Sequence, residues 1–501
     1  MKSLAVLLVS TSLLAAPPPA AKTPAPAPGE RTEPPPPAPP RPLKLPKPAE
    51  RTLANGLRVL VAERHEVPIA AARLVVMSGG EVDPKELAGL AQLTAALLAK
   101  GTETKSAPEL AEAVESLGTS LSTNAEWDAS AASLSVLATK LAPALSLLAD
   151  AVRRPAFHQE EIERLRKQRI DELSVSLGQP GVVAGLVADR LVFGESPYGH
   201  PIGGTPGSIA RIKRDDVVAL HRAWYRPDNA VLVLAGDVTP DGAFALAEKL
   251  FGDWAKPDGK PPAHAASAAA VLAPRAVVVD KPESGQAAVV LATRGIRRSD
   301  PDYYKGIVSN AVLTGYSGRL NQEIRVKRGL SYGAGSSLDS RRDTGPFTAS
   351  AQTKNESGGE VARLLGEELA KLEAGPPSAD ELTGRKMTLI GGFSRRFETA
   401  EGLASTLASA ALYGISFEEL QRWIPTVEAV KPEDVKAFAK SHLPRSGASL
   451  VVVGDAKKFL EALKKEIPTV EVIPFAELDI GSATLRKTPP PPTRSPKPTG
   501  S

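Results

Sequence analysis

The chain of 501 residues contains no cysteine. This absence excludes a disulfide scaffold, a thiolate zinc site, an iron–sulfur cluster, a cysteine nucleophile and lipid attachment at a cysteine. Aromatic side chains make up only 4% of the residues, so stacking platforms for single-stranded nucleic acid are not expected. The sequence also lacks G-x-S-x-G, the usual setting of a hydrolase serine. An independent hydrolase that uses other catalytic residues is therefore a weak hypothesis.

A strong excess of charge of one sign is also missing from the body of the chain. The net charge is +4, and segment 481–501 alone carries four bases and no acid, namely Arg486, Lys487, Arg494 and Lys497. The pI near 9.0 therefore predicts no basic face and no nucleic-acid partner. An apolar fraction of 42% and a charged fraction of 24% are typical of a soluble globular chain. These values exclude a wholly disordered protein and a multi-span membrane protein.

The first 16 residues have the parts of a secretory signal. Lys2 supplies the positive start, Leu4–Leu14 is a short apolar run, and small residues follow at Ala15–Ala16. The apolar run is too short to cross a bilayer, so we expect no transmembrane span in the mature chain. We predict export, to a periplasm or out of the cell. Residues 17–49 and 479–501 are rich in proline and are predicted to be an extended linker and tail.

Two segments of the body repeat without a gap at an offset of 218 residues. Ile212–Leu220 matches Val430–Phe438, and Ala230–Asp237 matches Ala448–Asp455. Each copy predicts a helix with acidic residues in its first turn, followed by a buried strand that ends in Gly-Asp. The match at the end of each half indicates an internal duplication.

Length and repeat together predict two homologous domains. A chain of 501 residues exceeds one ordinary domain of roughly 100–200 residues. We place the domains at 50–255 and 273–478, joined by a linker at 256–272 that is rich in proline and alanine.

Each domain is predicted to be α+β, with a mainly antiparallel sheet packed with helices. In the first domain, apolar residues predict two strands that pair, then helices, a further strand and more helices. The predicted strands are Gly56–Glu63, Ile69–Met77 and Ser130–Ala138, and the predicted helices are Glu86–Lys100, Pro108–Leu117, Leu141–Val152 and Gln159–Leu177.

Several short motifs are spread over nearly all of 50–478. They are Asn55-Gly-Leu-Arg-Val, Ser78-Gly-Gly, Gly89–Thr102, Ser196-Pro-Tyr-Gly-His-Pro and Tyr225-Arg-Pro-Asp-Asn, together with the Gly-Asp strand ends. With these motifs the chain resembles the pitrilysin/insulinase family of zinc peptidases (the inverzincins). The resemblance implies the two-domain metalloprotease fold that mitochondrial processing peptidase also has.

The segment Gly89–Thr102 departs from the family at the metal site. Active members carry H-x-x-E-H here, with two zinc-binding histidines and a Glu that acts as base for the metal-bound water. In this chain Gln92 and Ala96 take the histidine positions, and Ala95 takes that of the base. Glu172 resembles the family's distal Glu ligand, but a lone carboxylate on a charged helix is usually solvated. We therefore expect no metal cofactor and no metal-water catalysis in this chain.

The segment Leu313–Arg325, followed by Val-Lys-Arg-Gly-Leu-Ser-Tyr332, resembles the family segment that holds its substrate-binding Arg and Tyr. The spacing of seven between Arg325 and Tyr332 fits that pair. We expect Arg325 to end a helix and Tyr332 to open the next strand after a turn at Gly329. By this resemblance the arginine would clamp substrate carbonyls and the tyrosine would donate to the oxyanion.

The resemblance implies a divided enzyme. Some family members split the work between two similar subunits, one with the metal motif and one with the Arg/Tyr pair, which enclose a chamber that admits peptides. We therefore predict a substrate-binding subunit of a heteromeric zinc peptidase that degrades or processes peptides. Its partners would be unfolded peptides and a homologous subunit with intact H-x-x-E-H, which would carry the zinc. The alternative is a scaffold or peptide-binding protein of the same fold without a proteolytic role.

Overall fold

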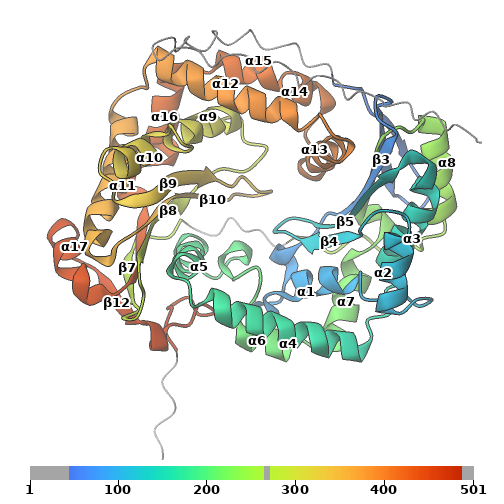
Figure 1. Cartoon of the computed structure of the whole chain (residues 1–501), viewed down its shortest axis with the longest axis horizontal. Coiled ribbons are helices and arrows are strands. Elements are labelled where there is room, and N and C mark those ends of the chain that lie inside the picture. The colour runs from blue at the N-terminus through green and yellow to red at the C-terminus, as the bar shows by residue number, and fades with distance from the viewer. Residues whose placement is uncertain (1–44, 265–270, 488–501) are drawn as a thin grey trace, which may run out of the picture. The chain divides into compact units, whose positions relative to one another are not determined.

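The computed structural model describes residues 45–264 and 271–487, and its elements are labelled in Figure 1. These residues belong to the larger of the two units into which the chain divides, which begins at Pro42. The predicted signal at 1–16 lies outside the described residues. So do most of the linker 17–49, the middle of the linker 256–272 and residues 488–501.

The first half forms a six-stranded sheet with the order β1-β2-β6-β3-β5-β4. The strands are β1 (Ala49–Thr52), β2 (Arg58–Glu63), β3 (Ile69–Val76), β4 (Ser122–Ala125), β5 (Ser130–Leu137) and β6 (Ala230–Gly236). The helices are α1 (Leu90–Leu97), α2 (Ala107–Glu115), α3 (Leu141–Arg153), α4 (Gln159–Ser176), α5 (Pro180–Phe193), α6 (Pro206–Arg211), α7 (Arg214–Trp224) and α8 (Pro240–Phe251).

The second half forms another six-stranded sheet, with the order β12-β7-β11-β8-β10-β9. The strands are β7 (Ala276–Asp280), β8 (Ala287–Arg294), β9 (Ser331–Leu338), β10 (Pro346–Thr353), β11 (Ser449–Gly454) and β12 (Glu471–Pro474). The helices are α9 (Tyr303–Leu313), α10 (Arg319–Asn321), α11 (Gly358–Ala374), α12 (Ala379–Arg395), α13 (Ala400–Tyr413), α14 (Phe417–Gln421), α15 (Trp423–Ala429), α16 (Pro432–His442) and α17 (Leu460–Glu466), with a π-helical turn at Gln322–Val326.

The two sheets share one topology, as the sequence repeat predicts. The series β2-β6-β3-β5-β4 corresponds to β7-β11-β8-β10-β9, and its first pair is parallel while the others are antiparallel. The repeat places α7 on α16 at an offset of 218. In each helix an Asp accepts a 2.8 Å hydrogen bond from the backbone N–H before the first turn, Asp216 from Lys213 and Asp434 from Lys431. The fold is therefore α+β, with two sheets packed with helices.

The predicted pairing of the first two long strands is wrong. Strand β6, from the end of the first half, lies between β2 and β3 and binds both, parallel to β2 and antiparallel to β3. All seven residues of β6 are buried, which suits a strand at the centre of a sheet. The two strands follow each other in the sequence, but the apolar β6 gains more by burial between them.

The helix predicted at Glu86–Lys100 is shorter than expected. A 3-10 turn covers Lys85–Leu87, and α1 begins at Leu90 because Gly89 has a left-handed φ of +94°. The Asp83 carboxylate accepts 2.7 Å hydrogen bonds from the N–H groups of Gly89 and Ala91. This anion at the helix start satisfies two free donors and opposes the positive end of the dipole.

The halves exchange one helix each, which the sequence did not predict. Helix α5 of the first half contacts β8 and β11 of the second sheet, and α13 of the second half contacts β3 and β6 of the first. Leu403 and Leu407 of α13 share a core with Val231 and Val233 of β6. The other face of each sheet packs against helices of its own half. Each half therefore completes its core only with a helix from the other.

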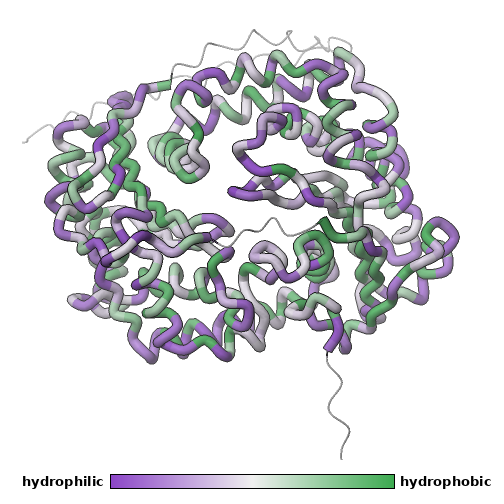
Figure 2. The backbone as a smooth tube through the Cα atoms, turned by 180° about the vertical axis from the view of Figure 1, so that it is seen from behind, coloured by the Kyte–Doolittle hydropathy of each residue, from purple (hydrophilic) through white to green (hydrophobic). Residues whose placement is uncertain are grey.

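The central strands are the hydrophobic centre of both halves. Figure 2 shows the hydrophobic colouring along these strands and more hydrophilic colouring on outer helices. Residues 479–487, predicted as tail, are part of the folded unit. Leu485 is fully buried beside Ile480, and Arg190 of α5 donates 3.1 and 3.0 Å hydrogen bonds to the Ile480 carbonyl. The proline-rich tail therefore begins later than position 479.

Candidate functional site

Arg325 and Tyr332 are positioned by a π-helical segment, a turn and the start of strand β9. The π-helical turn at Gln322–Val326 buries Ile324 completely, which leaves its neighbour Arg325 partly exposed. Gly329 then takes a left-handed φ of +65° and reverses the chain into β9, where Tyr332 is 91% exposed. The predicted placement of both residues is found, with a π-helical turn in place of the expected helix end.

The Arg325 guanidinium lies between two tyrosine rings. Its central carbon is 5.3 Å from the ring centre of Tyr332 and 5.5 Å from that of Tyr316. Both distances allow a cation–π attraction, which holds the side chain without occupying its N–H donors. Tyr316 is 75% exposed, and its carbonyl accepts hydrogen bonds from Asn321 and Gln322.

Arg325 forms no hydrogen bond or ion pair through its side chain with any residue of 45–264 or 271–487. Its basic neighbours Lys327 and Arg328 both bind Glu323, at 2.9 and 2.8 Å. The free donors of Arg325 and the hydroxyl of Tyr332 are therefore available to a ligand. The sequence analysis did not single out Tyr316. Its signal in the sequence is an aromatic residue between Gly315 and Gly318, and in the structure Gly315 has a φ of +88°.

Tyr332 also borders a cavity of about 810 Å³. The cavity lies between the first turns of α5 and the strands β8, β10 and β9. Its lining has no charged side chain and includes Gln179, Gln286 and Gln352 with several small residues. Strand β9 is the outermost strand of its sheet. An uncharged cavity beside a strand edge that has no strand partner among the described residues suits an extended peptide.

The residues at the degenerate metal site are engaged in ordinary structural contacts. Gln92 donates a 3.3 Å hydrogen bond to the carbonyl of Ala125, and Ala95 is fully buried in the core. Ala96 is partly buried on the same helix. Glu172 is exposed on α4 and binds Arg169 and Gln168 of its own helix, at 3.1 and 2.9 Å.

These residues do not fit zinc. Alanine has no ligand atom, the Gln92 amide is a poor substitute for imidazole, and the Glu172 carboxylate is paired locally. No three His, Asp or Glu side chains within 45–264 and 271–487 form a group that could hold a metal ion.

A polar network joins the halves at the β9–β10 loop. Arg342 donates to the Glu81 carboxylate at 2.8 Å and to the carbonyls of Met77 and Asp128 at 3.0 and 2.9 Å. The Tyr413 hydroxyl donates to the Asp128 carboxylate at 3.2 Å. Burial raises the pKa of the Asp128 carboxyl, and the hydrogen bond from the Tyr198 hydroxyl and the charge of Arg342 oppose the rise. Sequence analysis gave no sign of this network.

The adjacent Arg341 inserts among aromatic rings of the first half. Its guanidinium carbon is 4.5 Å from the ring centre of Trp127, 4.9 Å from Tyr198 and 5.8 Å from Phe193. Arg341 and Arg342 thus anchor the loop that follows β9, at the opposite end of this strand from Tyr332. The position of the Arg325 site relative to the first half depends on these contacts.

No helix among the described residues is both long and apolar enough to cross a membrane. Residues 58–189 match the family described as Insulinase (Peptidase family M16), and residues 211–389 match the one described as Peptidase M16 inactive domain. An uncharacterized zinc protease of Mycobacterium leprae is 27% identical over 82% of this chain and 92% of its own length. A Helicobacter pylori protein named as a non-peptidase homolog is 24% identical over 80% of this chain and 92% of its own length.

Solved structures show the same architecture. The crystal structure of a peptidase M16 inactive domain from Pseudomonas fluorescens superposes with a TM-score of 0.75 at 28% identity, over 81% of this chain and 98% of that one. A protease from Helicobacter pylori gives a TM-score of 0.77 at 20% identity, over 82% of this chain and all of that one.

Proposed function

Since the chain belongs to peptidase family M16, the insulinase family, but carries Gln92 and Ala96 at the histidine positions and Ala95 at that of the base, we propose that it is a non-catalytic, substrate-binding subunit. Its partner would be a homologous subunit with intact H-x-x-E-H. The observation that carries the proposal is the free Arg325 guanidinium held between the rings of Tyr316 and Tyr332.

Arg325 and Tyr332 have complementary roles in this proposal. The planar guanidinium binds the carbonyl oxygens of an extended substrate with several parallel N–H donors. The Tyr332 hydroxyl donates a hydrogen bond to the oxyanion that forms when water attacks the scissile carbonyl. The partner subunit supplies the metal-bound water and its base. Within residues 45–264, no group of three His, Asp or Glu side chains could hold the metal in its place.

The competing hypothesis is a scaffold or peptide-binding protein that takes no part in proteolysis. A scaffold has no need of an exposed tyrosine, since 91% of Tyr332 faces solvent and little of it contributes to the core. It also gains nothing from an unpaired arginine beside two such rings. The proteolytic role is therefore favoured over the scaffold.

Peptide hydrolysis by the reconstituted pair tests the proposal. Tyr332→Phe removes one hydroxyl and little volume, so assembly should survive while turnover falls about 100- to 1000-fold. Arg325→Lys keeps the positive charge but loses the planar set of guanidinium N–H donors. It should therefore weaken substrate binding as well. Tyr316→Phe is the matched control, because it keeps the ring beside Arg325 and removes a hydroxyl with no proposed role. If Tyr332→Phe assembles and hydrolyses at the wild-type rate, the scaffold hypothesis replaces this one.

Export remains part of the proposal and rests on the sequence of residues 1–16. In a cell that makes the protein, the mature chain should begin after Ala16 and should be found in the periplasmic or extracellular fraction. Sequencing of the mature N-terminus checks this directly. A mature chain that begins at Met1 in the cytosolic fraction would refute export.

A further inference from the structure

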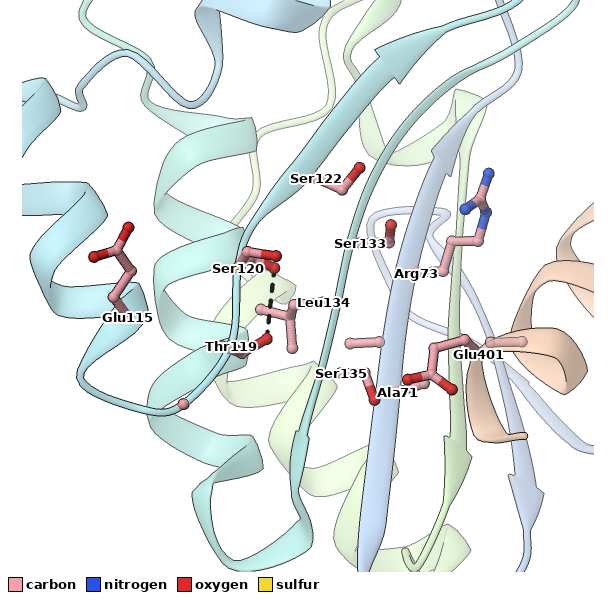
Figure 3. A pocket seen from close by; sticks show the side chains of 13 residues that line it. Ala71, Arg73, Glu115, Thr119, Ser120, Ser122, Ser133, Leu134, Ser135 and Glu401 are labelled. Atoms are coloured by element: carbon pink, nitrogen blue, oxygen red, sulfur yellow. Dashed lines mark hydrogen bonds between the residues drawn. The ribbon is translucent and has the colours of Figure 1, made fainter.

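Each sheet leaves part of one face uncovered, and the first half has a pocket of about 570 Å³ there. Helix α13 covers β3 and β6, and the pocket lies over β3, β5 and β4 beside that helix. Figure 3 shows Arg73 on its β3 wall and a series of hydroxyl side chains on β5, β4 and the segment before β4. The hydroxyl residues are Thr119, Ser120, Ser122, Ser133 and Ser135.

Arg73 lies in one row with two of these serines. It is the cross-strand partner of Ser133 on β5, and Ser133 is the partner of Ser122 on β4. Partners in adjacent antiparallel strands have side chains on the same face, about 5 Å apart at the Cβ atoms. The row therefore offers a guanidinium and two hydroxyl groups along one line of the pocket floor.

The Arg73 side chain has no hydrogen bond or ion pair within the described residues. Burial lowers the pKa of its guanidinium, and the more distant Glu126 carboxylate opposes this. A half-buried charge without a direct partner is unfavourable, and a bound anion would compensate it. Likewise, no hydrogen bond within 45–264 and 271–487 engages the hydroxyls of Ser122 and Ser133.

The second half shows that the fold does not need an arginine here. Val233 of β6 pairs with Arg73, and its repeat counterpart Val451 of β11 pairs with Val290. Val290 thus takes the place of Arg73 in the other sheet, and it lines the uncharged cavity beside Tyr332. The same location is apolar in one half and cationic in the other, so a sheet of this topology does not require a charge at this position.

The rim of the Arg73 pocket restricts the kind of anion. Glu115 and Glu401 are exposed at its edge and repel a ligand with spread or multiple negative charge. A single carboxylate is repelled less than an anion with several charges. Strand β4 forms one wall and is the outermost strand of its sheet, so its outer edge has no strand partner within the part of the chain that the structure describes. A peptide supplies backbone groups for that edge and a side chain for the pocket.

We propose that this pocket binds the carboxylate of an acidic side chain on an extended peptide, with Arg73 as the paired charge and Ser122 and Ser133 as hydrogen-bond donors. The chain thus selects peptides that carry an isolated Asp or Glu. This rests on the proposed function only for the peptide nature of the ligand, since the pocket is formed by different residues from the Arg325 site.

Fluorescence anisotropy on the full chain tests the proposal. The probes are two labelled peptides of about ten residues, long enough to extend some 33 Å, with one central Glu or Gln among small residues. The wild type should bind the Glu peptide about 10- to 100-fold more tightly than its Gln twin. Arg73→Val, which copies the second half, should abolish this preference. Arg51→Val is the matched control, because Arg51 is exposed on β1 at the opposite edge of the same sheet.

The two proposals fail separately. A Glu preference that survives Arg325→Lys and disappears in Arg73→Val locates the carboxylate in this pocket, whether or not a reconstituted pair hydrolyses peptides. Should Arg73→Val not fold, the double variant Ser122→Ala/Ser133→Ala must weaken the Glu preference. Equal binding of both peptides by the wild type overturns the proposal. Free glutarate that competes as strongly as the Glu peptide overturns the peptide assignment in favour of a small acid.

Discussion

The backbone N–H of Arg342 donates a 2.8 Å hydrogen bond to the carboxylate of Asp128, although the two residues are 214 positions apart. Arg342 belongs to the loop between β9 and β10, and Asp128 belongs to the equivalent loop between β4 and β5. The β9–β10 hairpin starts next to the Arg325 site. Its loop therefore contacts the corresponding β4–β5 loop of the other half. Contacts of this kind decide where the proposed substrate-binding residues lie.

The side chain of Arg342 should be essential to this contact. Arg342→Met removes the side-chain contacts with the Met77 and Asp128 carbonyls and the His264 ring, and it leaves the buried Glu81 carboxylate without its guanidinium partner. We expect the free energy of unfolding to fall by about 3–5 kcal/mol, the usual cost of breaking a buried pair. Urea denaturation measures it. Arg328→Met is the control, since Arg328 binds Glu323 at the surface and its loss should cost about 1 kcal/mol or less.

The stability of the protein should depend on pH through Asp189 of α5. Burial raises the pKa of this carboxyl to about 6, Arg341 opposes the rise, and the Asp339 carboxylate adds to it. The folded chain holds the proton more tightly than the unfolded chain, whose value is near 3.8. The free energy of unfolding therefore falls as the pH rises between these two values.

The variant Asp189→Asn isolates this effect. It should raise the free energy of unfolding by about 1–3 kcal/mol at pH 7 and leave it nearly unchanged near pH 4. Thermal melting over that pH range measures the difference. Asp171→Asn on the exposed side of α4 should leave the profile as it is. An equal gain from Asp189→Asn at both pH values would contradict the assignment.

The exchanged helices should make the two halves unfold together. Leu407 of α13 is 3% exposed and packs against the first sheet, although it belongs to the second half of the chain. Leu407→Ala should cost about 2–5 kcal/mol and lower one common melting transition. Ser405→Ala on the exposed side of α13 should change little. Two separate transitions, only one of them shifted, would show that the halves fold independently.

The purified chain should hold no stoichiometric zinc, because Ala95 and Ala96 offer no ligand atoms and Glu172 is paired within its helix. A metal bound to the folded state would raise the melting temperature, and a chelator would lower it again. We therefore expect EDTA to leave the melting temperature unchanged. Elemental analysis that finds one tightly bound zinc per chain would refute the expectation.

The sequence alone determined the features that depend on local pattern. The offset of 218 predicted two sheets of one topology, because duplicated segments keep their apolar spacing and their capping residues. It also determined the loss of the metal ligands, since Gln92, Ala95 and Ala96 lack the required imidazole and carboxylate groups whatever surrounds them. The neighbourhood of Arg325 and Tyr332 could be predicted because a short turn joins them.

Only the tertiary structure decided which distant segments meet. The insertion of β6 between β2 and β3, the exchange of α5 and α13, and the docking of Arg342 on Asp128 all join residues far apart in the chain. Periodicity tells which face of an element is apolar but leaves open which other apolar face covers it. The sequence could not predict the row formed by Arg73, Ser133 and Ser122 either. This row depends on strand register and on the part of the sheet that α13 leaves uncovered.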